Sequence, residues 1–165
     1  MNMKSFRALM ICRAGAAGAE MALVTPLLIV IMFGIFDAGN FFWNQHIVAN
    51  GVRDGVRFAA RQPLSAFSGC APTTAVRDAT RNVTRTGQVS GGTPRISNWT
   101  NAATITVTSP CSSGTTTGIY KNYPGGAPVV NVTATVVYQP LFNNLGFTTT
   151  NLNMKADAQA AVMGF

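Results

Sequence analysis

Charged residues are scarce in this sequence. Only 10% of its 165 residues are Asp, Glu, Lys or Arg, whereas 47% are hydrophobic. There is one histidine, His46, and the five acidic residues are scattered along the chain. General acid–base catalysis and metal binding both need several such groups close together. The sequence also lacks a Cys-x-x-Cys motif and a phosphate-binding glycine loop. We therefore expect no enzyme activity, no metal and no cofactor.

Acidic residues are the scarcer of the two charge types. Twelve Lys and Arg residues face five Asp and Glu residues, giving a formal charge of +7. Lys4, Arg7 and Arg13 all lie within residues 1–15, and removing that segment lowers the charge to +4. Basic residues gather at the cytoplasmic end of membrane helices, so part of the excess indicates topology. The remainder is modest, and we expect no nucleic-acid partner.

Cysteines are few and odd in number, which is unusual for an exported protein. Cys12 lies near the start, and Cys70 and Cys111 lie much later. If residues 1–15 are removed, one candidate pair is left. We predict a Cys70–Cys111 disulfide and an oxidising compartment. The alternative is two separate free thiols.

One long uncharged run is present, from Met21 to Phe36. A helix over residues 20–43 would span roughly 36 Å, enough to cross a hydrocarbon core of about 30 Å. The aromatic residues at 41–43 are typical of an interfacial anchor. The basic residues before the run place the N-terminus in the cytoplasm and the remaining chain outside it.

Two residues in this segment are unusual for a membrane helix. Pro26 removes a backbone hydrogen bond, and we expect it to kink or loosen the helix. Asp37 is costly in the bilayer interior, so we expect it near the outer interface, where water solvates it. Contact with a partner helix is the alternative for Asp37.

The junction before the run reads "RAGAAGAEMALVTPLL" over residues 13–28. A conventional secretory signal has its small-residue cleavage site after the apolar run, whereas here the small residues precede it. A carboxylate at the bilayer edge is costly unless it is paired. Cleavage after Gly15 would create an amine at Ala16, one helical turn from Glu20. Glu20 of one subunit could then pair with the amine of another. The simpler alternative is that Glu20 caps the helix N-terminus.

This order of leader, glycine, small residues, glutamate and apolar helix resembles the prepilin signal of type IV pilins and pseudopilins. In that family a membrane peptidase cuts after the glycine, and the helix stays in the mature protein. The segment "GAEMALVTPLLIVIMFGIFDAGNFFWNQHIVANGVRDGVRFAA" is similar to the N-terminal domain of TadE-like minor pilins of the tight-adherence (Flp, type IVb) pilus system. Met21 and Asp37 depart from the family's usual phenylalanine and glutamate.

The resemblance implies a structural minor pilin or pseudopilin that contributes to assembly of a pilus for surface adherence. It implies processing at Gly15, Ala16 and Glu20, and assembly roles for Glu20, Pro26 and Asp37. The implied partners are a prepilin peptidase, other pilins or pseudopilins, inner-membrane pilus assembly proteins and the lipid bilayer. The implied location is the bacterial inner membrane, with a single span and a periplasmic C-terminal domain. Incorporation into an extracellular pilus stays open.

Beyond the membrane segment, periodicity predicts that the helix continues to Ala60 or Arg61 with an apolar stripe. A second helix is expected over residues 74–86, with Gly87 as its stop signal. Each helix carries arginines at every fourth position: Arg53, Arg57 and Arg61 in the first, and Arg77, Arg81 and Arg85 in the second. We favour solvated faces with local pairs to Asp54 and Asp78. Binding of phosphate or an acidic partner is the alternative.

Alternating residues predict strands over 103–109, 129–138 and 152–162, although the end of the last segment is also compatible with a helix. A Gly/Ser/Thr/Pro-rich loop is expected from Pro110 to Pro128. The predicted fold class is therefore α+β, with a transmembrane helix that continues into an amphipathic helix and a small antiparallel sheet, in a pilin-like lollipop outline.

The expected domains are a cleaved leader (1–15), an N-terminal helix (16–61) and an extracytoplasmic α+β domain (62–165). A second function stays open: a single-pass, uncleaved adhesion or ligand-binding protein whose loop at 110–128 contacts a surface or a glycan. That protein would not need Glu20.

Overall fold

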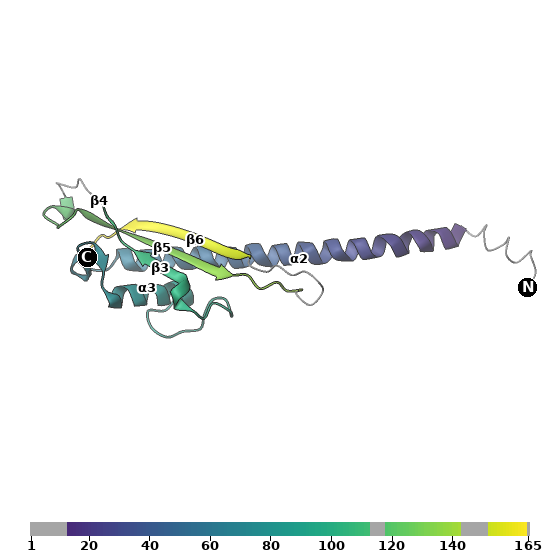
Figure 1. Cartoon of the computed structure of the whole chain (residues 1–165), viewed down its shortest axis with the longest axis horizontal. Coiled ribbons are helices and arrows are strands. Elements are labelled where there is room, and N and C mark those ends of the chain that lie inside the picture. Colours follow the sequence, from purple (N-terminus) through teal and green to yellow (C-terminus); the bar gives the residue numbers. More distant parts are fainter. Residues whose placement is uncertain (1–12, 113–117, 143–151, 165) are drawn as a thin grey trace, which may run out of the picture. The chain divides into compact units, whose positions relative to one another are not determined.

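The computed structural model describes residues 13–112, 118–142 and 152–164 (Figure 1). Most of the predicted leader and the middle of the predicted loop, residues 113–117, lie outside the described residues. The chain divides into two compact units, residues 1–40 and 41–165. The fold class is α+β, as predicted, because long helices combine with small antiparallel sheets.

Helix α2 (Arg13–Ala60) has 48 residues and ends where the apolar periodicity predicts. The boundary between the two units falls within it, after Asn40. The second part of α2 is therefore grouped with the sheets. The domain bounds that we expect from the sequence stay a prediction.

The second part of α2 contributes a buried stripe to the core of the folded unit. This stripe repeats every three to four residues, which is the period that places side chains on one face of a helix. Its buried members are Val48, Val52, Val56, Ala59 and Ala60. They share one hydrophobic core with side chains of the sheet. The predicted amphipathic face is therefore confirmed, except that Ile47 is only half-buried.

Helix α3 (Thr74–Thr86) has the predicted bounds. Its first turn is capped by Thr73, whose hydroxyl accepts a hydrogen bond from the backbone N–H of Val76. Its end is fixed by Gly87, which adopts φ +80° in the left-handed region that glycine tolerates. The predicted buried face needs one correction, because Ala79 is only half-buried. The fully buried positions are Thr80 and Thr84, beside Val76 and Val83.

A close contact between α2 and α3 explains why two threonines are buried. A Cβ placed on Gly51 would lie 2.5 Å from the carbonyl oxygen of Thr84, and a Cβ on Gly55 would overlap the Thr84 hydroxyl. The hydroxyls of Thr80 and Thr84 are satisfied within α3, because they donate to the carbonyls of Val76 (2.7 Å) and Thr80 (2.8 Å). Small residues on one helix thus allow close approach of the other.

Strand β5 (Ala127–Val137) is the centre of the main sheet. Strands β3 (Ile105–Thr108) and β4 (Cys111–Ser112) pair with it antiparallel in one continuous register. Strand β6 (Asn153–Ala161) pairs with it along nine residues, which decides for strand over helix in that segment. In Figure 1 this sheet runs beside the second part of α2.

The strand predictions hold for the inward faces and fail at the ends. Every second residue from Val130 to Tyr138 is buried, as the alternation predicts. Residues 102–104 form a 3-10 turn, η2 (Ala102–Thr104), rather than the start of a strand. In β6 only Met154 is buried, the three inward alanines are half-buried, and the preceding Leu152 is 40% exposed.

The remaining elements are short. They are η1 (Leu64–Ala66), η3 (Gly118–Tyr120) and a two-residue hairpin of β1 (Phe67–Ser68) and β2 (Ala71–Pro72). Trp99 lies in the connection before η2 and is 1% exposed, with its indole N–H donating to the Thr104 hydroxyl at 3.0 Å.

Candidate functional site

The predicted processing junction lies at the start of α2, where residues 15–20 are exposed. Gly15, Ala16 and Glu20 are helical and solvent-accessible. Ala16 and Glu20 are four residues apart, so they lie on the same face one turn from each other. A Cβ placed on Gly15 meets no atom within 4 Å. Within the described part of the chain, Glu20 has no ion-pair partner.

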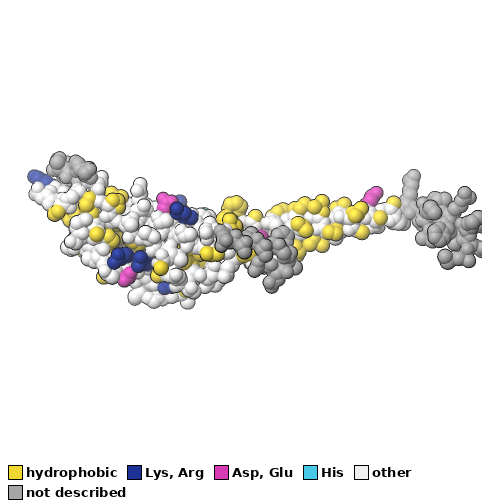
Figure 2. All heavy atoms as spheres, viewed as in Figure 1, with side chains coloured by type: hydrophobic (Ala, Val, Ile, Leu, Met, Phe, Trp, Pro, Cys, Tyr) yellow, Lys and Arg dark blue, Asp and Glu magenta, His cyan; other side chains and the backbone are white. Residues whose placement is uncertain are grey.

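The apolar part of α2 after this junction is not covered by the chain itself. The helix is long and apolar enough to cross a membrane, and none of its most apolar 18-residue window, with mean hydropathy 2.2, is buried. Leu23 is 80% exposed and Met21 is 65% exposed. Figure 2 shows hydrophobic side chains over this segment. An apolar surface of this length needs a bilayer or other apolar helices around it.

The aromatic residues that follow are also suited to an interface. Phe42 and Trp43 are each 69% exposed. Phe41 turns inward instead, with its ring 5.2 Å from the ring of Tyr138 in an edge-to-face arrangement. Phe41 therefore belongs to the packing of the folded unit, while the other two remain available as the predicted anchor.

Pro26 lies inside α2 without ending it. Proline has no backbone N–H, so the carbonyl of Ala22 lacks its usual helical partner. Thr25, directly before it, donates its hydroxyl to the carbonyl of Met21 at 2.6 Å. Such back-bonding further weakens the regular ladder. The turn from Met21 to Pro26 therefore has a less regular hydrogen-bond ladder than an ideal helix, and its role in assembly stays a prediction.

Asp37 lies on the same helix but far from the junction. It is half-buried, and 17 helical positions at 1.5 Å each separate it from Glu20 by about 25 Å. The two carboxylates therefore do not form a pair. Any function of Asp37 is separate from that of Glu20.

The two cysteines that the count predicts to pair are joined in the structure. Cys70 and Cys111 form a disulfide with a Cα–Cα distance of 5.4 Å. The bond links the β1–β2 turn to β4, so it fixes the predicted loop to the segment directly after α2. The loop is also held by two tyrosines: Tyr120 donates to the Val162 carbonyl at 2.6 Å, and Tyr123 donates to the carbonyls of Leu64 and Phe67.

The arginine stripe of α3 is occupied by contacts within the folded unit. Arg81 donates to the carbonyl of Ile105 at 3.0 Å and pairs with Asp78 at 3.4 Å. Arg85 donates to the carbonyl of Thr100, and Arg77 contacts the hydroxyl of Thr74. Arg81 and Arg85 thus hold α3 against β3 and the segment before η2, whereas the hydrogen bond of Arg77 stays within its own helix. The predicted local pair with Asp78 is confirmed.

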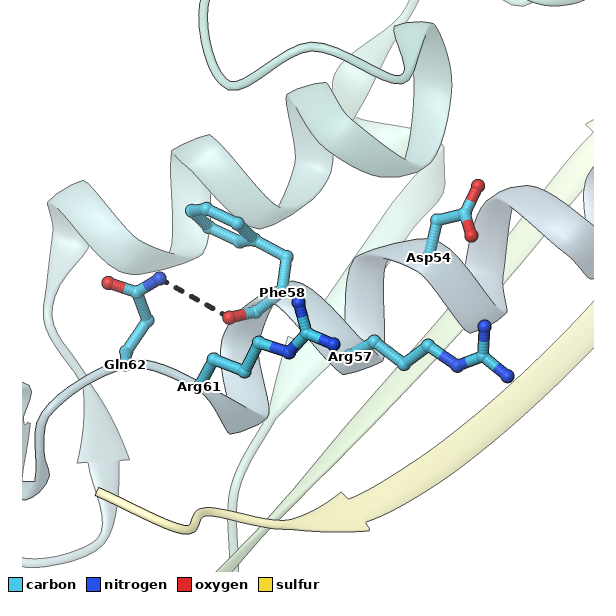
Figure 3. Close-up of a pocket in the computed structure, with 5 residues that line it drawn as sticks. All are labelled: Asp54, Arg57, Phe58, Arg61 and Gln62. Atoms are coloured by element: carbon cyan, nitrogen blue, oxygen red, sulfur yellow. Dashed lines mark hydrogen bonds between the residues drawn. The ribbon is translucent and has the colours of Figure 1, made fainter. Parts of the chain in front are cut away.

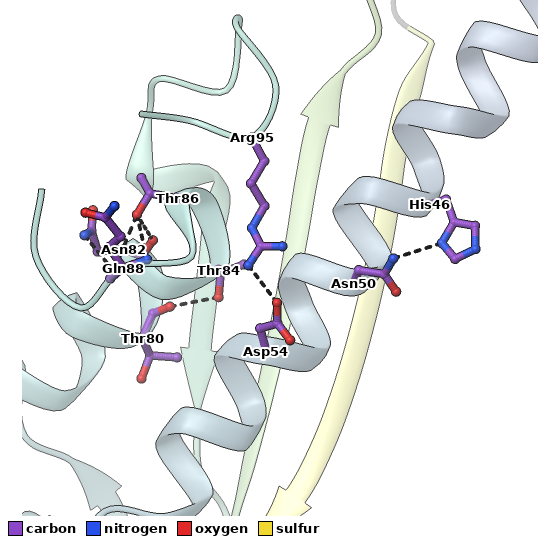
Figure 4. Close-up of polar contacts among 9 residues, drawn as sticks. All are labelled: His46, Asn50, Asp54, Thr80, Asn82, Thr84, Thr86, Gln88 and Arg95. Carbon is purple, nitrogen blue, oxygen red and sulfur yellow. Dashed lines mark hydrogen bonds and ion pairs between the residues drawn. The ribbon is translucent and has the colours of Figure 1, made fainter. Parts of the chain in front are cut away.

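The arginine stripe of α2, which ends at Arg61 directly after the helix, behaves differently. Arg53, Arg57 and Arg61 are all exposed, and none of their side chains makes a hydrogen bond or an ion pair with another residue that the structure describes. The predicted local pair with Asp54 is wrong. Asp54 is bound by Arg95 at 2.7 Å, across a sequence separation of 41 residues (Figure 4).

The single histidine makes only a helical side-chain contact. The Nδ1 of His46 lies 3.2 Å from the amide of Asn50, one turn further along α2 (Figure 4). Within the described ranges, no three His, Cys, Asp or Glu side chains gather where they could hold a metal ion.

These observations define a class: an α+β protein with one N-terminal helix long and apolar enough to span a membrane, joined to a disulfide-linked unit. A comparison with protein families narrows the class. Residues 15–57 match the family model described as "TadE-like protein". The N-terminal segment is TadE-like, consistent with a TadE-like protein of the Tad pilus system. No curated protein and no solved structure matches the chain.

The matched residues include the predicted processing residues Gly15, Ala16 and Glu20 and the apolar part of α2. They begin at Gly15, include the whole apolar helix and end at Arg57. Three features of the folded unit were not predicted from the sequence. They are the ion pair of Arg95 with Asp54, the burial of Trp99, and the close approach of α3 to α2 at Gly51 and Gly55. The four-residue spacing of the two glycines was an available signal, whereas no local pattern marks Arg95.

Proposed function

We propose that the chain is a structural minor pilin or pseudopilin of a Tad (type IVb) pilus, processed after Gly15 by a prepilin peptidase. One coincidence supports this proposal above all. The TadE-like match begins at Gly15, the residue at which the glycine–glutamate signal places the cut. No residue of the most apolar window of the helix that follows is buried within the chain, so this surface needs partners.

Cleavage would change the chemistry of the helix start. It would remove three basic residues and leave an ammonium group at Ala16, one turn from Glu20. In the low dielectric of a helix bundle, a carboxylate and an ammonium of neighbouring subunits attract strongly only in the correct register. Glu20 would therefore select how far one helix is shifted along the next. The peptidase, other pilins or pseudopilins and inner-membrane assembly proteins are the partners in this proposal.

The proposed topology follows the charges. Lys4, Arg7 and Arg13 stay in the cytoplasm, one helix crosses the inner membrane, and the folded unit lies in the periplasm. The disulfide supports this placement, because such bonds persist in oxidising compartments. The role is structural rather than catalytic, in keeping with the TadE-like family.

The direct test is the intact mass and N-terminal sequence of the membrane-extracted protein, with and without a co-expressed prepilin peptidase. We expect a peptidase-dependent start at Ala16. Gly15→Leu should block the cut, whereas Gly18→Leu is a matched control, because both glycines are exposed with open space around them.

An unchanged Met1, with a peptidase shown active on another prepilin, would refute the proposal. The chain would then be an uncleaved single-pass anchor. Glu20→Ala adds a second readout: it should impair pilus assembly while cleavage and membrane insertion continue. Normal assembly by this variant would show that Glu20 does not set the register between neighbouring helices.

A further inference from the structure

The two arginine stripes differ in a way that the sequence does not show. Both repeat every fourth residue, yet two arginines of α3 bind backbone carbonyls outside their own helix. The side chains of Arg53, Arg57 and Arg61 are exposed and have no intramolecular partner among the described residues. The one carboxylate beside them, Asp54, is occupied by Arg95. Three guanidinium groups thus form a row on the side of α2 away from the core.

Two hollows flank this row. Arg57 and Arg61 line one of about 460 Å³ together with Asp54, Phe58 and Gln62 (Figure 3). The same two arginines line another of about 420 Å³ on the β6 side. Its other walls are apolar: Ala60, Ala160, Ala161 and Met163. Cationic side chains next to an apolar hollow are typical of protein interfaces, in which arginine is enriched.

Charge decides what kind of partner fits. Residues 41–165 carry nine Lys and Arg and three Asp and Glu side chains, a net charge of +6. Asp54 and Asp78 are already paired, which leaves Asp157. A second copy of this unit would bring another +6 against the row, and like charges oppose docking. The carboxylates must therefore come from a different chain.

The membrane surface is too far away to be the partner. If Trp43 marks the outer interface, Arg53 lies about 15 Å and Arg61 about 27 Å further along the helix. Electrostatic attraction to lipid headgroups is screened within about 8 Å at physiological ionic strength.

We propose that the row Arg53–Arg57–Arg61 and the apolar hollow beside β6 form a docking surface for an acidic segment of another protein. Guanidinium groups bind carboxylates as two-pronged donors, so carboxylates at matching spacing would engage the row. An apolar side chain of the same segment would enter the hollow that Ala60, Ala160, Ala161 and Met163 line. The surface belongs to the folded unit, and it is independent of cleavage after Gly15.

The test uses the purified full chain in a neutral detergent. The probe is a labelled alanine-based helical peptide with three glutamates at four-residue spacing and a neighbouring leucine. A second peptide has glutamine in place of each glutamate, and inorganic polyphosphate is a third probe. Binding is measured by fluorescence anisotropy at low and at physiological salt. The key variant is R57Q/R61Q, and the charge-matched control is K121Q/K155Q, because both lysines are exposed.

We expect the glutamate peptide to bind, the glutamine peptide not to bind, and R57Q/R61Q to raise Kd by roughly tenfold or more. The lysine control should change Kd by no more than about twofold, the size of a general charge effect. Equal loss in both double variants would overturn the proposal, as would failure of the acidic peptide to bind. Tighter binding of polyphosphate than of the peptide would also overturn it and assign the row to phosphate.

Discussion

Helix α2 is one continuous element with two opposite burial patterns. In the first part, none of the most apolar window is buried. In the second part, Val48, Val52 and Ala59 are fully buried within the chain's own core. The apolar side chains of the second part are therefore covered by the chain's own core. Those of the first part need a bilayer or other apolar helices to cover them.

Residue distribution around the helix accounts for this difference. The first part is apolar on every side, which is the pattern of a helix in a bilayer or a bundle. The second part carries an apolar stripe on one side and arginines on the other, which is the pattern of a helix on the surface of a soluble domain. The TadE-like match covers both patterns, so the change from one to the other is part of the matched segment.

A charge placed in each part gives the largest expected contrast. Ile29→Lys introduces an ammonium group into the uncovered apolar part, at a cost of about 2.5–3.5 kcal/mol at the centre of a membrane helix. We expect part of the protein to be extracted by alkaline carbonate. Asn50→Lys places the same charge on an exposed position of the second part and should leave extraction unchanged. Equal extraction of both variants would show that the first part is not inserted.

Removing the disulfide should act on the folded unit alone. Cys70 and Cys111 are 41 residues apart, and closing a loop of that length is worth about 4 kcal/mol in the chain-entropy account. We expect the double variant C70S/C111S to lose about 2–4 kcal/mol of unfolding free energy in denaturant titration. Cys12→Ser is the matched control and should leave this free energy unchanged. Membrane extraction should be the same for all three proteins, because the apolar helix does not depend on the bond.

Local signals are what made part of this structure predictable. The end of α3 follows from the glycine stop at Gly87, directly after the last helical residue. The inward face of β5 follows from strict alternation. The candidate processing site also rests on a local signal, because glycine, glutamate and the apolar run are neighbours in sequence, and it stays a prediction.

Contacts between distant segments were not predictable. Asp54 has Arg57 one turn away, yet it binds Arg95, because the chain after α3 returns to that side of α2. The arginines of α3 have the same four-residue spacing as those of α2. Arg81 and Arg85 differ in that backbone carbonyls of a neighbouring segment lie within reach of their side chains. Trp99 lies in a stretch without periodicity and is nevertheless part of the core.

The smallest expected effect compares two glycines of α2. In a free helix, Gly→Ala stabilises by roughly 0.5–1 kcal/mol. A Cβ on Gly34 meets nothing within 4 Å, so Gly34→Ala should not destabilise the folded unit. A Cβ on Gly55 overlaps the buried hydroxyl of Thr84, and overpacking of this kind costs about 1–3 kcal/mol. We therefore expect a lower melting temperature for Gly55→Ala and an unchanged one for Gly34→Ala.

If Thr84 is the cause, G55A/T84S should not recover stability, because serine keeps the hydroxyl, whereas G55A/T84A should recover part of it. Recovery in neither would show that α3 does not pack against this turn of α2.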